Sequence, residues 1–261
     1  MIAALRGALG FFTRIPVGRS EAAWEAFVRA PWTFPVVGYL VGGVVAAPLL
    51  LAVVRPLPEP TVALSVLLAI YAVTGITHLD GVADLGDAAV VHGDAADRRE
   101  VMRDSALGVG GTLALALVVI GMLTGLLGVV RVGTAGASSG WGVATAAAIV
   151  VVAEVSARTA AGLLVCVGDA AHTGLGSSVI DRAGPRATLP MFALAVPAVA
   201  LGWPRLVPGV AALVAALGTA VVMRRWANRR LGGISGDVLG ATTELSRVAA
   251  LHAGVIAWTL S

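Results

Sequence analysis

Residues 109–130 read VGGTLALALVVIGMLTGLLGVV, an apolar run without a charged side chain. A helix needs roughly 20 such residues to cross a hydrocarbon core about 30 Å thick. The composition of the whole chain agrees, because 58% of its 261 residues are hydrophobic and only 13% are charged. This composition excludes a soluble domain of this length and predicts an all-α fold, a polytopic transmembrane helical bundle.

Further apolar runs lie on both sides of residues 109–130, and the pattern is weakest after Asp181. A proline-rich turn from Arg55 to Pro60 separates the first two runs. We expect about seven spans, within a range of six to eight, and a single integral membrane domain over 1–261. The predicted spans are 34–54, 61–77, 109–130, 141–165, 187–202, 206–222 and 248–260.

The arginines predict the orientation, because cytoplasmic loops keep an excess of positive charge. The chain has eighteen arginines and no lysine. With the N-terminus inside, fourteen arginines fall on the inner side and only Arg55, Arg131 and Arg205 on the outer side. We therefore expect a cytoplasmic N-terminus and a location in the cell (cytoplasmic or inner) membrane.

The stretch 1–33 mixes apolar residues with arginines and glutamates, and it lacks the apolar core and cleavage site of a signal peptide. We expect it to lie along the membrane interface as an amphipathic helix, in contact with lipid. Orientation also explains the sequence pI near 10.0, so nucleic acid is not an expected partner. The single cysteine, Cys166, excludes an internal disulfide and a cysteine-based metal cluster.

The strongest chemical signal is HLDGVADLGD at residues 78–87, directly after the second predicted span. In a helix, Asp80, Asp84 and Asp87 stand at i, i+4 and i+7 and share one face, where they repel one another unless a cation lies among them. Mg²⁺ fits this set, since it takes one or two carboxylates together with waters and substrate phosphates. Gly81 lets a bulky ligand approach the backbone. His78 has three open roles: metal ligand, proton-transfer group or hydrogen-bonding residue at the span end.

A second polar segment, RREVMRDSALGVGG, occupies residues 98–111. Arg103 offers a phosphate clamp, Asp104 a further metal-binding carboxylate and Ser105 a hydroxyl. The glycines that follow open the third span, and backbone N–H groups at such a helix start favour an anion. Arg98 and Arg99 are interpreted as anchors of orientation.

The third polar segment, GGISGDVLGATTE, occupies residues 232–244 and precedes the last predicted span. Asp237 and Glu244 stand seven residues apart, on one face if the segment is helical. Ser235, Asp237, Thr242 and Glu244 are candidates for binding metal, phosphate or a sugar, and Gly236 is a candidate ligand-binding glycine of the same segment. Segments 78–111 and 223–247 are thus the predicted catalytic segments on the cytoplasmic side.

One pair of opposite charges lies inside the fourth predicted span. Glu154 and Arg158 have the i, i+4 spacing that lets them form an ion pair. Two interpretations stay open for Arg158, a buried pair that holds helices together and a contact to a ligand.

In these segments the chain resembles the cobalamin synthase family, the adenosylcobinamide-GDP ribazoletransferases. The resemblance covers nearly the whole chain and includes, besides HLDGVAD, the motifs FTRIP at 12–16, FPVVG at 34–38, MRDS at 102–105, GLGS at 174–177 and GDVLGA at 236–241. It departs from the family's pattern only in loops, where Ala88, Ala89, Ala106 and Val109 are small and apolar.

The resemblance implies a Mg²⁺-dependent transfer of the cobinamide-phosphate group from adenosylcobinamide-GDP to α-ribazole or α-ribazole 5′-phosphate, with release of GMP. It also implies that Arg14, in FTRIP, belongs to the ligand-binding residues. A second copy of the chain and other enzymes of nucleotide-loop assembly are further candidate partners. We hypothesise that Asp80, Asp84 and Asp87 hold Mg²⁺, while Asp104 or Asp237 adds a metal contact or receives the proton of the acceptor hydroxyl. Arg103 would stabilise charge on the phosphoryl group or on GMP.

Two rival functions remain. A CDP-alcohol phosphotransferase shares the beginning of the Asp80–Asp84 motif, although the arginine after the alanine and the later paired aspartates of that family are missing. A transporter would use Glu154, Arg158 and the aspartates as an ion path, but it has no need of carboxylates gathered on one side.

Overall fold

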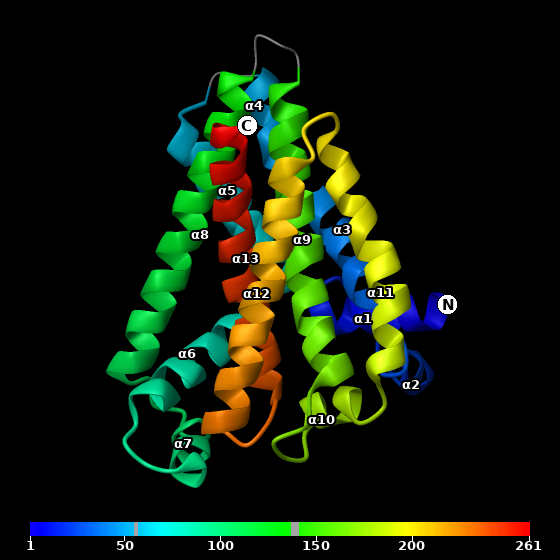
Figure 1. Cartoon of the computed structure of the whole chain (residues 1–261), viewed down its shortest axis with the longest axis vertical. Helices are drawn as coiled ribbons and strands as arrows, with labels where there is room; N and C mark the ends of the chain where they lie inside the picture. The colour runs from blue at the N-terminus through cyan, green and yellow to red at the C-terminus, as the bar shows by residue number, and fades with distance from the viewer. Residues whose placement is uncertain (55–56, 137–140) are drawn as a thin grey trace.

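The computed structural model describes residues 1–54, 57–136 and 141–261, and its described residues form a bundle of helices without a named β-strand (Figure 1). The only β-pairing among them is an isolated bridge between Ala170 and Ile234. The all-α prediction is confirmed. The elements are α1 Ile2–Phe12, α2 Glu21–Phe27, α3 Thr33–Val45, α4 Ala47–Val54, α5 Glu59–Thr74, α6 Thr77–Val90, α7 Ala95–Val101, α8 Val109–Ala135, α9 Gly142–Val167, α10 Leu175–Ile180, η2 Pro185–Ala187, α11 Thr188–Ala195, η3 Val196–Gly202, α12 Val207–Arg230 and α13 Gly236–Leu260.

Five stretches of helix are long and apolar enough to cross a membrane, and the bent pair α5–α6 makes six if it is counted as one span. The five are 33–50, 109–135, 142–167, 185–202 and 207–230, which agree with predicted spans. The predicted span 248–260 is instead the second half of the 25-residue helix α13, whose first half carries Asp237, Glu244 and Arg247. These charges lower the mean hydropathy of α13, so α13 is not among the candidate spans. The number of candidate spans, six with the bent pair, is therefore at the lower end of the predicted range of six to eight.

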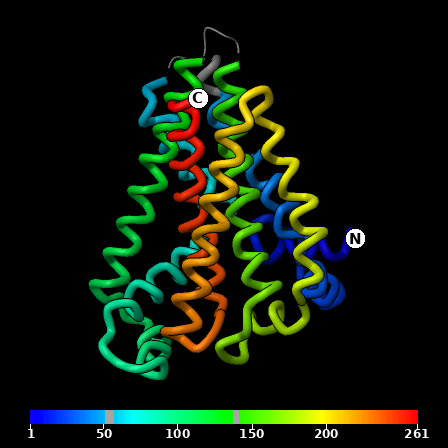
Figure 2. The backbone as a smooth tube through the Cα atoms, viewed as in Figure 1, coloured from blue at the N-terminus to red at the C-terminus, as the bar shows by residue number. Residues whose placement is uncertain are grey.

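The chain bends by 96° between α5 and α6. Gly75 sits at this bend with φ +77°, a left-handed conformation that side chains with a Cβ rarely adopt. As a result α6 leaves the direction of α5 and runs obliquely along one end of the bundle (Figure 2). The bend places the carboxylates of α6 at the end of the bundle, outside the long helices.

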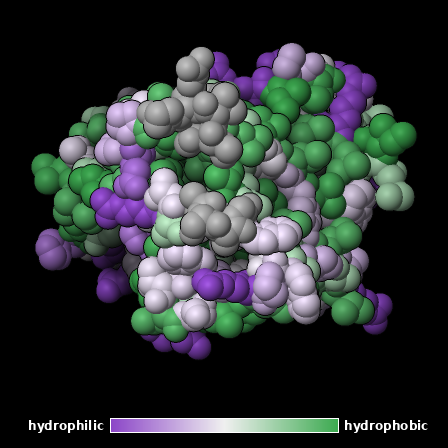
Figure 3. Space-filling model, turned by 90° about the horizontal axis from the view of Figure 1, so that it is seen from above, coloured by the Kyte–Doolittle hydropathy of each residue, from purple (hydrophilic) through white to green (hydrophobic). Residues whose placement is uncertain are grey.

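The predicted inner and outer loops separate to opposite ends of the bundle. Figure 1 shows α6, α7 and α10 together at the lower end, which we call the site end. Arg131 and Arg205 lie at the other end, which Figure 3 shows from above with hydrophilic side chains scattered among hydrophobic ones. Arg55 and the predicted connection at 137–140 lie outside the described residues. The arrangement agrees with the predicted topology, while the identity of the cytoplasmic side stays a prediction.

The N-terminal stretch forms two short helices, α1 and α2, instead of the single interfacial helix predicted over 1–33. The chain is irregular between them, where Pro16 lacks a backbone N–H, and α2 restarts at Ser20, whose hydroxyl accepts a hydrogen bond from the N–H of Ala23. Phe12 and Phe27 join the two helices to Phe34 at the start of α3 through ring contacts of 4.8–6.1 Å. The N-terminal stretch is thereby attached to the bundle.

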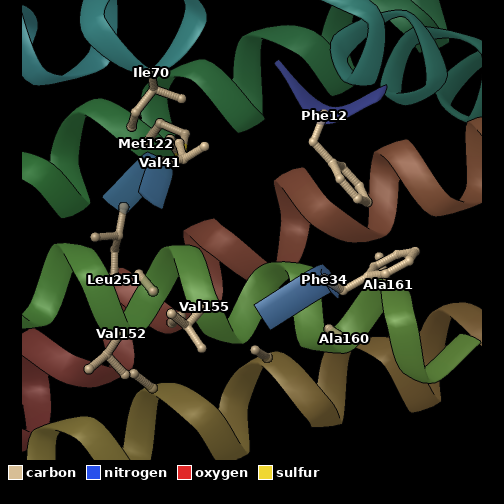
Figure 4. Close-up of a cluster of buried hydrophobic side chains, with 14 of the residues drawn as sticks. Phe12, Phe34, Val41, Ile70, Met122, Val152, Val155, Ala160, Ala161 and Leu251 are labelled. Atoms are coloured by element: carbon tan, nitrogen blue, oxygen red, sulfur yellow. The ribbon is translucent and has the colours of Figure 1, made fainter. Parts of the chain in front are cut away.

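Helix α9 lies at the centre of the hydrophobic core. It is buried on nearly all sides, as expected of a helix surrounded by other helices, and most of its side chains are apolar. Alanines such as Ala160 and Ala161 allow close approach of neighbouring backbones, which is how membrane helices pack. Figure 4 shows these alanines near Phe34, while Val152 and Leu251 of α13 occupy another part of the same cluster.

The core also contains a network of four buried charges on α9 and α13, which the partly buried His78 joins to α6. Glu154 pairs with Arg158 along α9, and its other oxygen lies 2.6 Å from Nε of Arg247 on α13. Nη1 of Arg247 lies 2.6 Å from Glu244, whose second oxygen is 3.6 Å from Nδ1 of His78 at the start of α6. Two carboxylates and two guanidiniums make the network electrically neutral, the condition under which charges are tolerated away from water.

We expect the substitution Arg247→Met to lower the free energy of unfolding by about 3–5 kcal/mol, because it leaves Glu154 and Glu244 buried without their shared cation. The measurement is the unfolding of purified protein in detergent. Arg131→Gln is the matched control, since Arg131 forms an exposed ion pair with Glu59 at 3.1 Å and its loss is worth less than about 1 kcal/mol. Equal stability of the two variants would contradict a structural role for the network.

Candidate active site

Three predicted polar segments meet at the site end. They are α6, the α7–α8 connection and the N-terminal turn of α13, which lie together at the lower end of the bundle in Figure 1. The loop before α10 joins them through the bridge between Ala170 and Ile234. Segments that are far apart in sequence thus lie side by side, while the catalytic role of residues 78–111 and 223–247 stays a prediction.

Helix α6 packs directly on the start of α13 at Gly81. A methyl group on Gly81 would lie 2.6 Å from the carbonyl oxygen of Asp237, so a larger residue here would force the helices apart. One turn along each helix, the backbone of His78 lies close to Gly240. This contact sets the carboxylates of α6 beside Asp237.

The carboxylates of α6 and α13 influence one another electrostatically. Burial, followed by the negative charges of Asp237, Asp80 and Asp87, raises the pKa of Asp84 to about 6. An array of this kind favours a cation, which removes the repulsion. Asp80 is exposed at the site end, whereas Asp84 and Asp237 are half-buried.

A small cavity of about 100 Å³ adjoins Asp237. Arg99 and Arg103 from α7 and its C-terminal turn line it, together with His172 and Ser235. Nη1 of Arg99 donates a 2.6 Å hydrogen bond to the carbonyl of Leu231, which fixes α7 against the entry to α13. The cavity therefore combines cationic donors with one carboxylate, an arrangement suited to a phosphate group.

Ser235 caps the N-terminus of α13. Its hydroxyl accepts a 3.3 Å hydrogen bond from the N–H of Val238 and donates a 3.2 Å hydrogen bond to Asp237. The adjacent Gly236 is exposed, so the backbone at this helix start is open to a ligand. These bonds fix Asp237 at the cavity.

Asp87 has a structural contact that the sequence did not reveal. Its two oxygens accept hydrogen bonds from the N–H groups of Gly108 at 2.9 Å and Gly111 at 2.8 Å. The anion predicted for the glycine-rich start of α8 is thus the protein's own carboxylate. Because both oxygens are engaged in this cap, Asp87 is the least available of the four aspartates predicted to bind metal.

Among the described residues, no group of three His, Cys, Asp or Glu side chains is arranged to hold a metal ion by itself. The donors that do converge, Asp80, Asp84 and Asp237, offer hard carboxylate oxygens. This set fits Mg²⁺, which needs only one or two carboxylates when substrate phosphates complete its coordination. It does not fit a permanent structural metal site.

The remaining predicted residues are Asp104, Ser105 and Arg14, which are exposed, and Glu244 and Arg158, which are buried in the core. Asp104 and Ser105 follow Arg103 and are exposed, and Asp104 accepts a 3.0 Å hydrogen bond from the N–H of Ala106. Arg14 is held by a 2.7 Å bond from its N–H to the carbonyl of Val73, and its side chain lies against Gly75 at the start of α6.

Glu244 and Arg158, in contrast, are buried inside the charge network of the core. This position agrees with the structural interpretation of Arg158 and keeps its guanidinium away from the exposed side chains of the site end. Sequence reasoning also missed Arg99 and Arg247, which it counted only as markers of orientation. Their proximity to two polar segments was the signal that could have identified them.

Comparison with known proteins identifies the family. The sequence model of the cobalamin-5-phosphate synthase family matches residues 4–255. A protein of Halorubrum lacusprofundi named adenosylcobinamide-GDP ribazoletransferase is 65% identical over 259 residues, 99% of each chain. A protein of the same name from Haloquadratum walsbyi is 45% identical over 100% of both chains. Another, from Escherichia coli O17:K52:H18, is 33% identical over 94% of this chain and 96% of the relative. No solved structure matches.

The chain belongs to the cobalamin-5-phosphate synthase family. It is therefore a transferase of cobalamin biosynthesis with several transmembrane helices, and the predicted resemblance is confirmed. A match across almost the whole chain favours this family over the phosphotransferase and transporter alternatives.

The cap on α8 leads to a test that does not need substrate. We expect Asp87→Ala to speed hydrogen exchange of the amides from Gly108 to Thr112, because two of the N–H groups in this turn lose their acceptor. Asp97→Ala is the matched control, since Asp97 accepts a 2.8 Å bond from the N–H of Asp94 in the separate cap of α7. Unchanged exchange at 108–112 in Asp87→Ala would show that this cap does not form in solution.

Proposed function

We propose that this protein transfers the cobinamide-phosphate group of adenosylcobinamide-GDP to α-ribazole or its 5′-phosphate, with release of GMP. The observation that carries the proposal is the convergence of the α6 carboxylates, Arg103 and Asp237 at one end of a membrane bundle. Phosphoryl transfer needs charge neutralisation and in-line positioning more than covalent chemistry. The names of the relatives support the choice of donor and acceptor.

We assign Asp80 and Asp84 as the residues that would hold Mg²⁺, with Asp104 as a further candidate. When bound, Mg²⁺ supplies positive charge to the oxygens of the donor's diphosphate. Burial and then the negative charges of Asp237, Asp80 and Asp87 raise the pKa of Asp84 to about 6, and a bound cation would relieve the repulsion among these charges. Asp87 remains a weaker candidate, because its oxygens cap α8.

The residues around the cavity bind and orient the reacting groups. Arg103 donates hydrogen bonds to the phosphoryl oxygens and offsets the charge that develops on them. The acceptor hydroxyl oxygen forms the new bond to phosphorus while the bond from phosphorus to the GMP oxygen breaks. The hydroxyl proton passes to Asp237, which lines the cavity and is oriented by the hydroxyl of Ser235.

The direct test is GMP release by the purified protein in lipid vesicles, given adenosylcobinamide-GDP and α-ribazole 5′-phosphate. We expect release that depends on Mg²⁺ and that yields a corrinoid product. Asp84→Asn should lower kcat by about 10²-fold or more, because an amide replaces a charged metal ligand. Asp181→Asn is the control, as Asp181 is exposed at the end of α10. Folded protein that releases no GMP with either acceptor would overturn the proposal.

Arg103 is tested by a substitution that keeps its charge. Arg103→Lys should still lower kcat/KM by about tenfold or more, since lysine cannot form the bidentate bonds that a guanidinium makes to phosphate. Steady-state kinetics with both acceptors would measure the effect. Wild-type kinetics in this variant would remove Arg103 from the phosphate-binding residues.

A further inference from the structure

The back of α6 lines an apolar groove that the transferase site does not use. Val82, Leu85 and Ala89 line it, on the face of α6 opposite to Asp80, Asp84 and Asp87. Leu117 of α8, Trp226 of α12 and Leu245 of α13 complete its walls. The groove has a volume of about 380 Å³, and its lining is almost entirely apolar.

The groove opens between two membrane-spanning helices. Figure 1 shows α8 diverging from α12 toward the site end, with α6 between them. Leu117 is 62% exposed and Val222, on the facing side of α12, is 64% exposed. Exposed apolar side chains on spans face hydrocarbon, so the surroundings of the groove are the acyl region of the bilayer.

The same face of α12 becomes basic where it reaches the site end. Val222, Arg225, Trp226 and Arg229 stand at i, i+3, i+4 and i+7, so the two arginines continue the stripe that lines the groove. Both arginines are exposed. An aromatic residue followed by exposed arginines is the arrangement that binds the interfacial region and an anionic head group.

We propose that this groove binds one hydrocarbon chain of an anionic membrane lipid, whose head-group phosphate contacts Arg225 and Arg229. The chain fills the space behind α6 and supports the helix from the side opposite to its carboxylates. A second copy of this chain fits the observations less well, because a helix inserted in the groove would bring no anionic group to the arginines.

Native mass spectrometry of the full-length protein tests the proposal without relying on its catalytic function. Delipidated protein in detergent is titrated with dioleoylphosphatidylglycerol or with dioleoylphosphatidylcholine. We expect one phosphatidylglycerol to be retained in preference to phosphatidylcholine. The double variant Arg225→Gln/Arg229→Gln should weaken phosphatidylglycerol retention about tenfold or more and leave phosphatidylcholine unaffected.

Two controls isolate the groove. Arg131→Gln/Arg205→Gln removes two exposed arginines at the opposite end and should not change lipid retention. Leu117→Trp fills the groove and should lower retention, whereas Leu68→Trp, at an equally exposed leucine of α5 that does not line the groove, should not. Equal retention of both lipids, or equal effects of Leu117→Trp and Leu68→Trp, would overturn the proposal. So would a dimer of delipidated protein that Leu117→Trp dissociates, because the occupant would then be a second copy.

Discussion

The position of Arg247 between Glu154 and Glu244 is the interaction on which the arrangement of the bundle depends. Charges inside a membrane protein are tolerated only when they are paired, so each member of this network fixes the place of the others. Arg247 and Glu244 lie on α13, Glu154 and Arg158 on the central α9, and His78 at the start of α6. One neutral cluster thereby sets the rotation of α13 about its axis, and that rotation in turn decides which side of α13 meets α6.

The site follows from this rotation. With Glu244 directed to the core, the N-terminal turn of α13 presents Asp237 to α6 and to the cavity beside Arg103. The absence of a side chain at Gly81 allows the two helices to approach until carboxylates from both lie together. In the proposed function, this repulsion would be relieved by the cations that accompany the phosphates of the substrate. Among the described residues no three His, Cys, Asp or Glu side chains form a metal site, so the proposed Mg²⁺ would need oxygens of the substrate as further ligands.

Much of the fold could be predicted from the sequence, because a helix that crosses the hydrocarbon core of a membrane must be apolar over roughly 20 residues. Runs such as 109–130 and 141–165 are apolar over a membrane's thickness, and each became a helix of that length. The stretch 77–90 is a helix, so the condition under which Asp80, Asp84 and Asp87 share one face is met. The same pattern could not reveal that Asp87 caps α8, since its partners lie 21 and 24 residues further along the chain and meet it only after α6 and α8 pack. The partners of Arg247 were hidden for the same reason.

Helix α6 shows how one short segment serves two environments. Its acidic face brings Asp80, Asp84 and Asp87 near Asp237 of α13, while the opposite, apolar face lines the groove with residues of α8 and α12. The 96° bend after α5 turns the chain into α6, which contacts both α8 and α13. The left-handed conformation of Gly75 turns the chain from α5 into α6, so this one residue determines where the aspartates of α6 lie.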